Sequence, residues 1–230
     1  MNGGAFGSPP FLTAQAQARA EAKAQLMLRL RARGLRDLAL LRAIESVPRE
    51  NFVGPAHVDL ALRDIAIPLP CGQTMEAPST LAQMLAALAP RPGDRILEIG
   101  CGSGYSTAVL AMTGREVVSL ECFQRLAQDA RARLEKLGLR NAAVLWADGF
   151  EISPSYGLFD RILAHGALER VPANLWGALG EGGVLVAPRR DASGQGVLIR
   201  HAREAGDRIV ETTIGPCRAQ SLLRGLFRAS

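Results

Sequence analysis

The sequence predicts an α/β fold with a mostly parallel, Rossmann-like sheet, an antiparallel C-terminal hairpin and additional N-terminal helices. Three observations predict this fold class. Short apolar runs alternate with helical patterns from residue 95 onward, which is typical of parallel sheets. A glycine-rich turn follows the first of these runs. The last two runs are separated by little more than Ala205-Gly206-Asp207, a connection that is short enough for a hairpin.

Apolar periodicity places the individual elements of the sheet. Strands are expected at residues 95–99, 117–120, 143–146, 159–164, 183–186, 197–202 and 209–214. Helices are expected at residues 105–112, 123–137 and 173–179. Because ligands of open parallel sheets bind at the carboxyl ends of the strands, we expect functional residues directly after these strands.

The N-terminal region is predicted to be helical and then irregular. Helices are expected over residues 14–33 and 38–44, whereas residues 49–78 are rich in proline and turn residues. A loop of this length in a compact domain is typical of a functional segment. Ser79 is expected to cap a further helix over residues 80–88.

These elements divide the chain into three parts. Residues 1–13 are expected to be a flexible tail, and residues 14–78 to hold the N-terminal helices and a functional loop. Residues 79–230 are expected to form the main domain, which packs with residues 14–78 as one compact unit.

Composition favours a globular protein without concentrated charge. Of 230 residues, 48% are apolar and 21% are charged, which is ordinary for a soluble domain. The net charge of +5 is spread along the chain, and its densest part, residues 19–42, has the spacing of a solvated helix face. The concentrated basic and aromatic surface of many nucleic-acid-binding proteins is missing, so nucleic acid is not the expected partner.

Cysteine usage indicates reduced thiols in a cytoplasmic protein. Cys71, Cys101, Cys122 and Cys217 lie far apart, with no C-x-x-C pair or adjacent histidine, which argues against a metal site and against disulfides. No apolar run reaches the roughly 18–20 residues that span a bilayer. Residues 1–10 lack the charged start and apolar run of a secretion signal.

The glycine-rich turn indicates a nucleoside site. Residues 100–105 read G-C-G-S-G-Y, and such a turn offers positive φ angles and free N–H groups at a helix start. A dinucleotide fingerprint requires glycine where Tyr105 stands. Glu98, just before the turn, would repel a pyrophosphate and attract the ammonium and sulfonium of S-adenosylmethionine.

Two further acidic residues follow the next two predicted strands. Glu121 comes about twenty residues after the turn, where a carboxylate can accept hydrogen bonds from a ribose diol. Asp148, followed by Gly149, comes after the third strand, where it could accept a hydrogen bond from an adenine amino group. Together with Glu98 they predict an S-adenosylmethionine site and methyl transfer.

Three segments carry a resemblance to a known family. VPRENFV at residues 47–53, GQT at 72–74 and LEIGCGSGY at 97–105 resemble the protein-L-isoaspartate O-methyltransferase family, in order and with its spacing. ADG at 147–149, FDRI at 159–162 and GGVLVAP at 182–188 support the resemblance. It extends from about residue 25 to about residue 210.

The resemblance implies a class I methyltransferase fold, S-adenosylmethionine as cofactor and a specific reaction. That reaction is methylation of L-isoaspartyl carboxylates in damaged proteins or peptides, which starts their repair. The residues implied to hold the cofactor are Gln73, Thr74, Met75, Glu98, Gly100, Gly102, Ser103, Gly104, Glu121, Cys122, Asp148 and Gly149. An isoaspartyl carboxylate is ionised near pH 7 and already nucleophilic, so no general base is required.

The predicted catalytic positions are Thr74, Glu76, Ser79 and His165. The family usually reads G-Q-T-I-S-x-P, whereas residues 72–78 read GQTMEAP, with Glu76 at the serine position. An ionised Glu76 would repel an acceptor carboxylate. Three outcomes remain open: Glu76 is protonated, it turns away while Ser79 or Thr80 supplies a hydroxyl, or the acceptor is different.

Two other departures lie on the acceptor side. His165 follows the fourth strand, where the family has small residues; it could face the acceptor as a base or donor, or bond to nearby backbone. Residues 215–223, GPCRAQSLL, match poorly the V-x-F-V-P-L-like stretch of the family. The alternatives are therefore a related methyltransferase with a small-molecule or basic side-chain acceptor, and a non-catalytic S-adenosylmethionine-binding homologue. A monomer and a dimer are both compatible with the exposed N-terminal helix.

Overall fold

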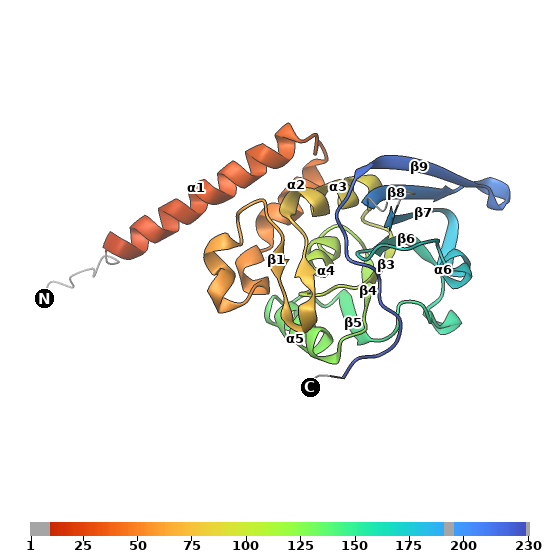
Figure 1. Cartoon of the computed structure of the whole chain (residues 1–230). Helices are drawn as coiled ribbons and strands as arrows, with labels where there is room; N and C mark the ends of the chain where they lie inside the picture. Colours follow the sequence, from red (N-terminus) through yellow and green to blue (C-terminus); the bar gives the residue numbers. More distant parts are fainter. Residues whose placement is uncertain (1–9, 191–195, 229–230) are drawn as a thin grey trace, which may run out of the picture.

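A seven-stranded sheet forms the centre of the computed structural model, which describes residues 10–190 and 196–228. The strand order is β5-β4-β3-β6-β7-β8-β9 (Figure 1). Neighbouring strands run parallel from β5 to β7, and the pairs β7–β8 and β8–β9 are antiparallel. The strand bounds are β3 Arg95–Ile99, β4 Glu116–Glu121, β5 Ala142–Trp146, β6 Phe159–Ala164, β7 Leu179–Arg190, β8 Gly196–Arg203 and β9 Ile209–Pro216. The predicted fold class is confirmed.

Strand β7 is longer than the sequence predicts. It begins at Leu179, where a helix was expected to end, and it continues through Pro188 to Arg190. Proline cannot donate a backbone hydrogen bond, so it reads as a strand end in the sequence. Here Pro188 pairs opposite Leu198 of β8, and its carbonyl accepts a hydrogen bond from the Leu168 amide.

Six α-helices are present in the described residues. Their bounds are α1 Pro10–Ala32, α2 Leu38–Ser46, α3 Pro78–Leu88, α4 Tyr105–Ala111, α5 Gln124–Lys136 and α6 Ala173–Ala178. Helix α1 begins four residues earlier than predicted, so residues 10–13 are helical rather than part of a tail. Proline suits the first turn of a helix because its missing N–H would have no partner there. Residues 1–9 of the predicted tail lie outside the described part.

The capping role predicted for Ser79 is wrong. Helix α3 begins at Pro78 with Ala77 as its N-cap, and no side-chain bond caps it. The Ser79 amide instead donates to Asp64 Oδ1 at 2.9 Å. A carboxylate from the preceding loop therefore satisfies a helix amide that a local hydroxyl was expected to satisfy.

The segment between α2 and α3 contains short turns and a small hairpin. Its elements are the 3-10 helices η1 Arg49–Phe52, η2 Pro55–Leu60 and η3 Pro70–Gly72, and the antiparallel strands β1 Ile67–Pro68 and β2 Thr74–Met75. Two further 3-10 helices are η4 Pro154–Tyr156 and η5 Ala205–Asp207. The hairpin places residues 73–76 beside the glycine-rich turn.

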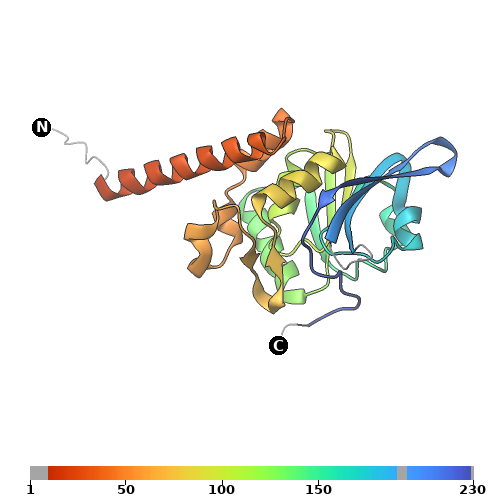
Figure 2. The same ribbon diagram turned by 45° about the horizontal axis from the view of Figure 1, so that its top comes forward.

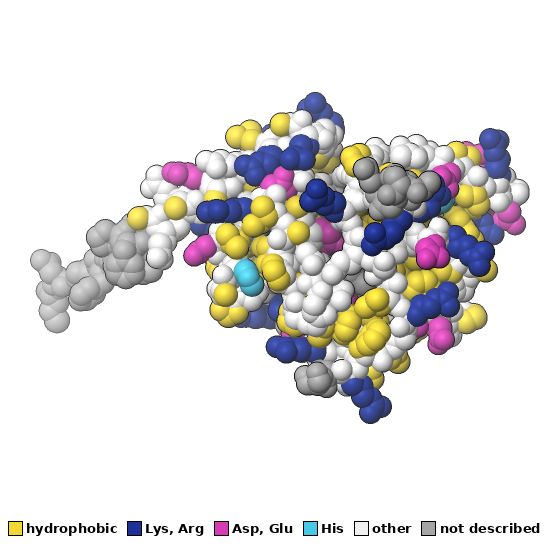
Figure 3. Space-filling model, in the orientation of Figure 1, with side chains coloured by type: hydrophobic (Ala, Val, Ile, Leu, Met, Phe, Trp, Pro, Cys, Tyr) yellow, Lys and Arg dark blue, Asp and Glu magenta, His cyan; other side chains and the backbone are white. Residues whose placement is uncertain are grey.

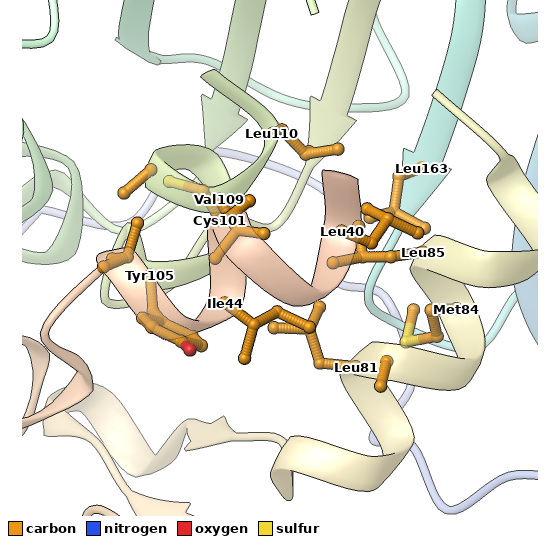
Figure 4. Close-up of a cluster of buried hydrophobic side chains, with 14 of the residues drawn as sticks. Leu40, Ile44, Leu81, Met84, Leu85, Cys101, Tyr105, Val109, Leu110 and Leu163 are labelled. Atoms are coloured by element: carbon orange, nitrogen blue, oxygen red, sulfur yellow. The ribbon is translucent and has the colours of Figure 1, made fainter. Parts of the chain in front are cut away.

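The main apolar cluster lies between the sheet and helices α1 to α5. Figure 4 shows part of it, where Leu40 and Ile44 of α2 meet Leu85 of α3 and Val109 of α4. A second cluster on the opposite face joins β3, β6 and β7 to Leu175 of α6. Both faces of the parallel strands are thus buried, as near-continuous apolar strands require.

The two ends of the chain take different courses. The first half of α1 extends away from the body of the protein (Figures 1 and 2), and residues 14–21 are exposed. The segment after β9, drawn dark blue, passes across the carboxyl ends of the central strands in both views. In the part of the chain that is described, no helix has the length and apolar character needed to cross a membrane.

Candidate active site

The turn between β3 and α4 depends on glycine for its own geometry. Gly100, Gly102 and Gly104 have φ angles of +79°, +55° and +83°. A Cβ atom on Gly104 would lie 2.9 Å from Cβ of Ala130 on α5, which is closer than side chains approach. The glycines therefore bring the turn close to α5 and leave its backbone open on the other side.

A cavity of about 590 Å³ lies at the carboxyl ends of the strands, a size typical of small-molecule sites. One wall is formed by the glycine turn and the residues that follow β4 and β6. The opposite wall comes from residues 64–80 and from the chain after β9. The predicted site residues that line it are Gln73, Thr74, Glu76, Gly100, Gly102, Glu121, Cys122 and His165.

Glu121 ties the glycine turn to the end of β4. Its side chain is 3% exposed; Oε2 accepts from the Gly102 amide at 2.8 Å and Oε1 from the Phe123 amide at 2.9 Å. Burial raises the pKa of Glu121, against the opposing effect of these backbone hydrogen bonds. The carboxylate is thus held in a fixed orientation on the cavity wall.

Glu98 lies beneath the cavity rather than on its wall. It is fully buried and accepts hydrogen bonds from the hydroxyls of Ser106, Thr107 and Ser119. Burial alone would raise its pKa, but hydrogen bonds and the charge of His165 hold the pKa below its ordinary value. The cation that Glu98 faces in the structure is therefore His165.

His165 lies between two carboxylates. Its Nδ1 is 2.9 Å from Glu76 Oε1, and its Nε2 is 2.9 Å from Glu98 Oε1. Burial lowers the pKa of His165, but the charges and hydrogen bonds of the two glutamates outweigh burial and raise the pKa to about 10. His165 is consequently an imidazolium at neutral pH, and Glu76 is ion-paired with it.

The hydroxyls considered as substitutes for the family serine lie in different places. Thr80 lines the cavity, whereas Ser79 does not. Glu76 does not turn away from the cavity, as one of the outcomes left open by the sequence would require; its carboxylate lines the cavity and is paired with another group. That group is His165, a partner that the sequence did not suggest.

The loop over residues 73–76 is anchored by a buried arginine. Arg49 is 1% exposed, donates through Nη2 to the Glu76 carbonyl at 2.6 Å, and lies over the Tyr105 ring. Arg49 belongs to the VPRENFV segment, but the sequence alone indicated no role for it. Met75 is buried under the loop, where its sulfur accepts a hydrogen bond from the Ser103 hydroxyl. Met75 and Ser103, both predicted to bind the cofactor, therefore lie below the cavity.

The segment after β9 covers Asp148, the remaining acidic residue that was predicted to bind the cofactor. We call this segment, residues 217–228, the C-terminal strap. Asp148 Oδ2 accepts from the Gly225 amide at 2.6 Å, and Asp148 and Gly149 do not line the cavity. The Phe227 ring stacks on Phe123 with centroids 4.8 Å apart, and its amide donates to the Cys122 carbonyl. The strap therefore contacts the side of the site that the sequence assigns to adenine.

Close backbone approach also fixes the strap near His165. A Cβ on Gly166 would lie 2.6 Å from the Leu222 Cα, and Ala167 and Ser221 form a β-bridge. Gln220 donates to the Gly72 carbonyl at 3.1 Å. Gly166 was the only local signal in the sequence for this approach, and it does not identify the segment that approaches.

Within residues 10–190 and 196–228, no group of three His, Cys, Asp or Glu side chains is placed to hold a metal ion. The four cysteines are free. Basic side chains are dispersed over the face of the molecule in Figure 3 rather than gathered into one patch.

A parallel sheet with a glycine turn after one central strand and a buried carboxylate after the next defines a nucleoside site of the methyltransferase type. A family model described as protein-L-isoaspartate(D-aspartate) O-methyltransferase matches residues 21–220. The chain belongs to this family.

Individual relatives agree with this assignment. A protein-L-isoaspartate O-methyltransferase of Rhodopseudomonas palustris (strain BisB5) is 47% identical over 175 residues, covering 76% of this chain and 81% of the relative. One from Bradyrhizobium sp. (strain ORS 278) is 41% identical over 196 residues, covering 85% and 91%.

Solved structures show the same fold. A structure named protein-L-isoaspartate O-methyltransferase has a TM-score of 0.79 at 24% identity and covers 89% of this chain and 67% of that chain. A Plasmodium falciparum structure, described as a putative protein-L-isoaspartate O-methyltransferase in complex with S-adenosyl-L-homocysteine, has a TM-score of 0.75 at 22% identity and covers 86% and 97%.

Proposed function

We propose that this protein transfers the methyl group of S-adenosylmethionine to the carboxylate of L-isoaspartyl residues in damaged proteins or peptides. The observation that carries the proposal is the cavity in which the glycine turn and Glu121 meet the loop over residues 73–76. It lies in a chain that belongs to the corresponding family.

The residues of the cavity fit this cofactor at its ribose end. Glu121 offers a buried carboxylate for a diol, and the turn at Gly100 and Gly102 offers close backbone approach. At the end of the site that is expected to hold adenine, the strap contacts Asp148. When bound, S-adenosylmethionine supplies an electrophilic methyl group on a sulfonium centre.

The chemical demands on the protein are then modest. An ionised carboxylate needs no base, so this chain has to align the acceptor and exclude water. Gln73, Thr74, Arg190 and Arg218 line the cavity, and the two arginines would attract an anionic acceptor. Thr80 also lines the cavity, and its hydroxyl would be able to donate to a carboxylate oxygen there.

A direct test is incubation of the full chain with an isoaspartyl peptide and methyl-labelled cofactor. We expect a base-labile methyl ester on the peptide, because carboxyl esters hydrolyse in mild alkali. Glu121→Gln should weaken cofactor binding about tenfold or more, since hydrogen bonds to a charged acceptor are worth roughly 1.5–3 kcal/mol. Cofactor binding by the wild type without any methyl ester would contradict the proposal and favour the non-catalytic alternative.

A basic side-chain acceptor is the second candidate, and Glu76 is the residue that would favour it. Glu76 is ion-paired with His165, so its charge is already compensated and is not free to attract a second cation. This pairing supports the carboxylate acceptor. Transfer of label to a lysine peptide in preference to the isoaspartyl peptide would reverse this conclusion.

We also infer a cytoplasmic location, supported by four free thiols, which are typical of a reducing compartment.

A further inference from the structure

We propose that His165 is a positioning and specificity-determining residue, which pairs with Glu76 and thereby makes the cavity accept an anionic acceptor. This inference rests on the proposed function, because it concerns the acceptor of that reaction. It assigns the roles of two residues at which the chain departs from its family's usual sequence. In this account the two departures depend on each other.

The hydrogen bonds around His165 require a cation. Each ring nitrogen faces a carboxylate oxygen at 2.9 Å. Carboxylates only accept hydrogen bonds, so both ring nitrogens have to carry protons to satisfy both contacts. Ser106 lies 3.0 Å from Nε2 and donates its own proton to Glu98. Its oxygen therefore also faces the ring as an acceptor.

The surroundings place the two carboxylates on different sides of His165. Glu98 is fully buried and, besides its contact with His165, accepts hydrogen bonds from three hydroxyls, so its charge does not depend on His165 alone. Glu76 lines the cavity, where it would meet an incoming acceptor. Pairing with His165 makes the cavity-facing part of the cluster neutral, whereas Glu76 alone would present a full negative charge.

The ion pair that the structure gives Glu76 is with His165. Arg190 and Arg218 line the same cavity but are not paired with Glu76 in the described part of the chain. Burial raises the pKa of the Cys101 thiol well above its ordinary value, and burial together with Glu76 raises the pKa of Cys217 to about 11. Both thiols are therefore neutral at pH 7. Arg49 contacts the Glu76 backbone carbonyl rather than its carboxylate.

A charge-balance test uses His165→Gln, Glu76→Gln and the double variant. Glutamine keeps a hydrogen-bonding amide but carries no charge. We expect His165→Gln to raise the KM for an isoaspartyl peptide about 10- to 100-fold, because it exposes Glu76 to the acceptor. The Kd for S-adenosylmethionine should change less than threefold. The double variant should recover a KM within about threefold of the wild type, because it removes both charges.

His201→Gln is the matched control. His201 is also buried, at 5% exposed, but it packs against Trp176 and lies near Glu211, away from the cavity. Its substitution should leave the KM for the peptide unchanged. If the double variant keeps the KM of His165→Gln while still binding cofactor, the charge-pairing role is overturned and His165 is structural.

The protonation of His165 provides a readout that needs no turnover. Nitrogen NMR of the ring should show both nitrogens protonated at pH 7, with the signal assigned by its loss in His165→Gln. A neutral ring at pH 7 would overturn the inference even in an active enzyme. Two protonated nitrogens in a protein that forms no methyl ester would instead overturn the proposed function and leave the charge pairing intact.

Discussion

At the scale of single residues, the site depends on contacts between residues that are far apart in sequence. Glu76 and His165 are 89 positions apart, and Glu98 and His165 are 67 apart. The sequence identified each as unusual or functional, but reading them one at a time showed Glu76 only as a repulsive charge. The contact that compensates it depends on the topology that brings β3, β6 and the small hairpin together.

Gly104 provides a residue-scale test of the turn. Gly104→Ala would place a Cβ 2.9 Å from Ala130 at a φ of +83°. We expect a loss of about 1–3 kcal/mol in the free energy of unfolding, measured by urea denaturation. Gly93→Ala is the control, because a Cβ there meets nothing within 4 Å. Equal effects of the two substitutions would contradict the close packing of the turn on α5.

The raised pKa of His165 predicts how stability depends on pH. The group binds its proton more tightly in the folded protein, where its pKa is about 10 against an ordinary value of 6.5. Its contribution is complete below pH 6.5 and is lost as pH rises toward 10. The urea midpoint of the wild type should therefore fall across this range more steeply than that of His165→Gln. Parallel pH profiles would contradict an ion-paired His165.

At the scale of elements, the alternation of strands and helices was predictable, but the contacts between segments far apart in sequence were not. Strand β6 has the predicted bounds, because its apolar run ends cleanly on both sides. The length of strand β7 was underestimated because Pro188 is typical of a strand end, whereas here it pairs with Leu198 of β8. The strap could not be predicted, since backbone contacts to Cys122 and Asp148 leave no periodic pattern in residues 217–228.

The strap leads to an element-scale prediction about cofactor binding. Gly225 donates to an oxygen of Asp148, the residue that the family resemblance assigns to adenine, so we expect cofactor entry to compete with the strap. Phe227→Ala removes the stacking on Phe123 and should lower the Kd for S-adenosylmethionine about 2- to 10-fold, as measured by calorimetry. Leu226→Ala, at an exposed neighbouring position, is the control. A weaker affinity in Phe227→Ala would mean that the strap completes the cofactor site.

At the scale of the whole molecule, the sheet sets the order in which the functional parts meet. We expect the cofactor side over β3 and β4, and the acceptor side over β6 between the 73–76 loop and the strap, because these elements line one cavity. On the face shown in Figure 3, basic side chains are dispersed, which fits individual anionic residues in a peptide better than a polyanion.

The most direct measurement of the central claim compares two isomeric peptides that differ only in an L-isoaspartyl or an L-aspartyl linkage. Both carry the same net charge, so electrostatic attraction alone cannot separate them. The account predicts that kcat/KM for methyl ester formation is at least about a hundredfold higher for the isoaspartyl peptide, because only its carboxylate reaches the aligned position. Equal values for the two peptides, or methylation of neither, would contradict it.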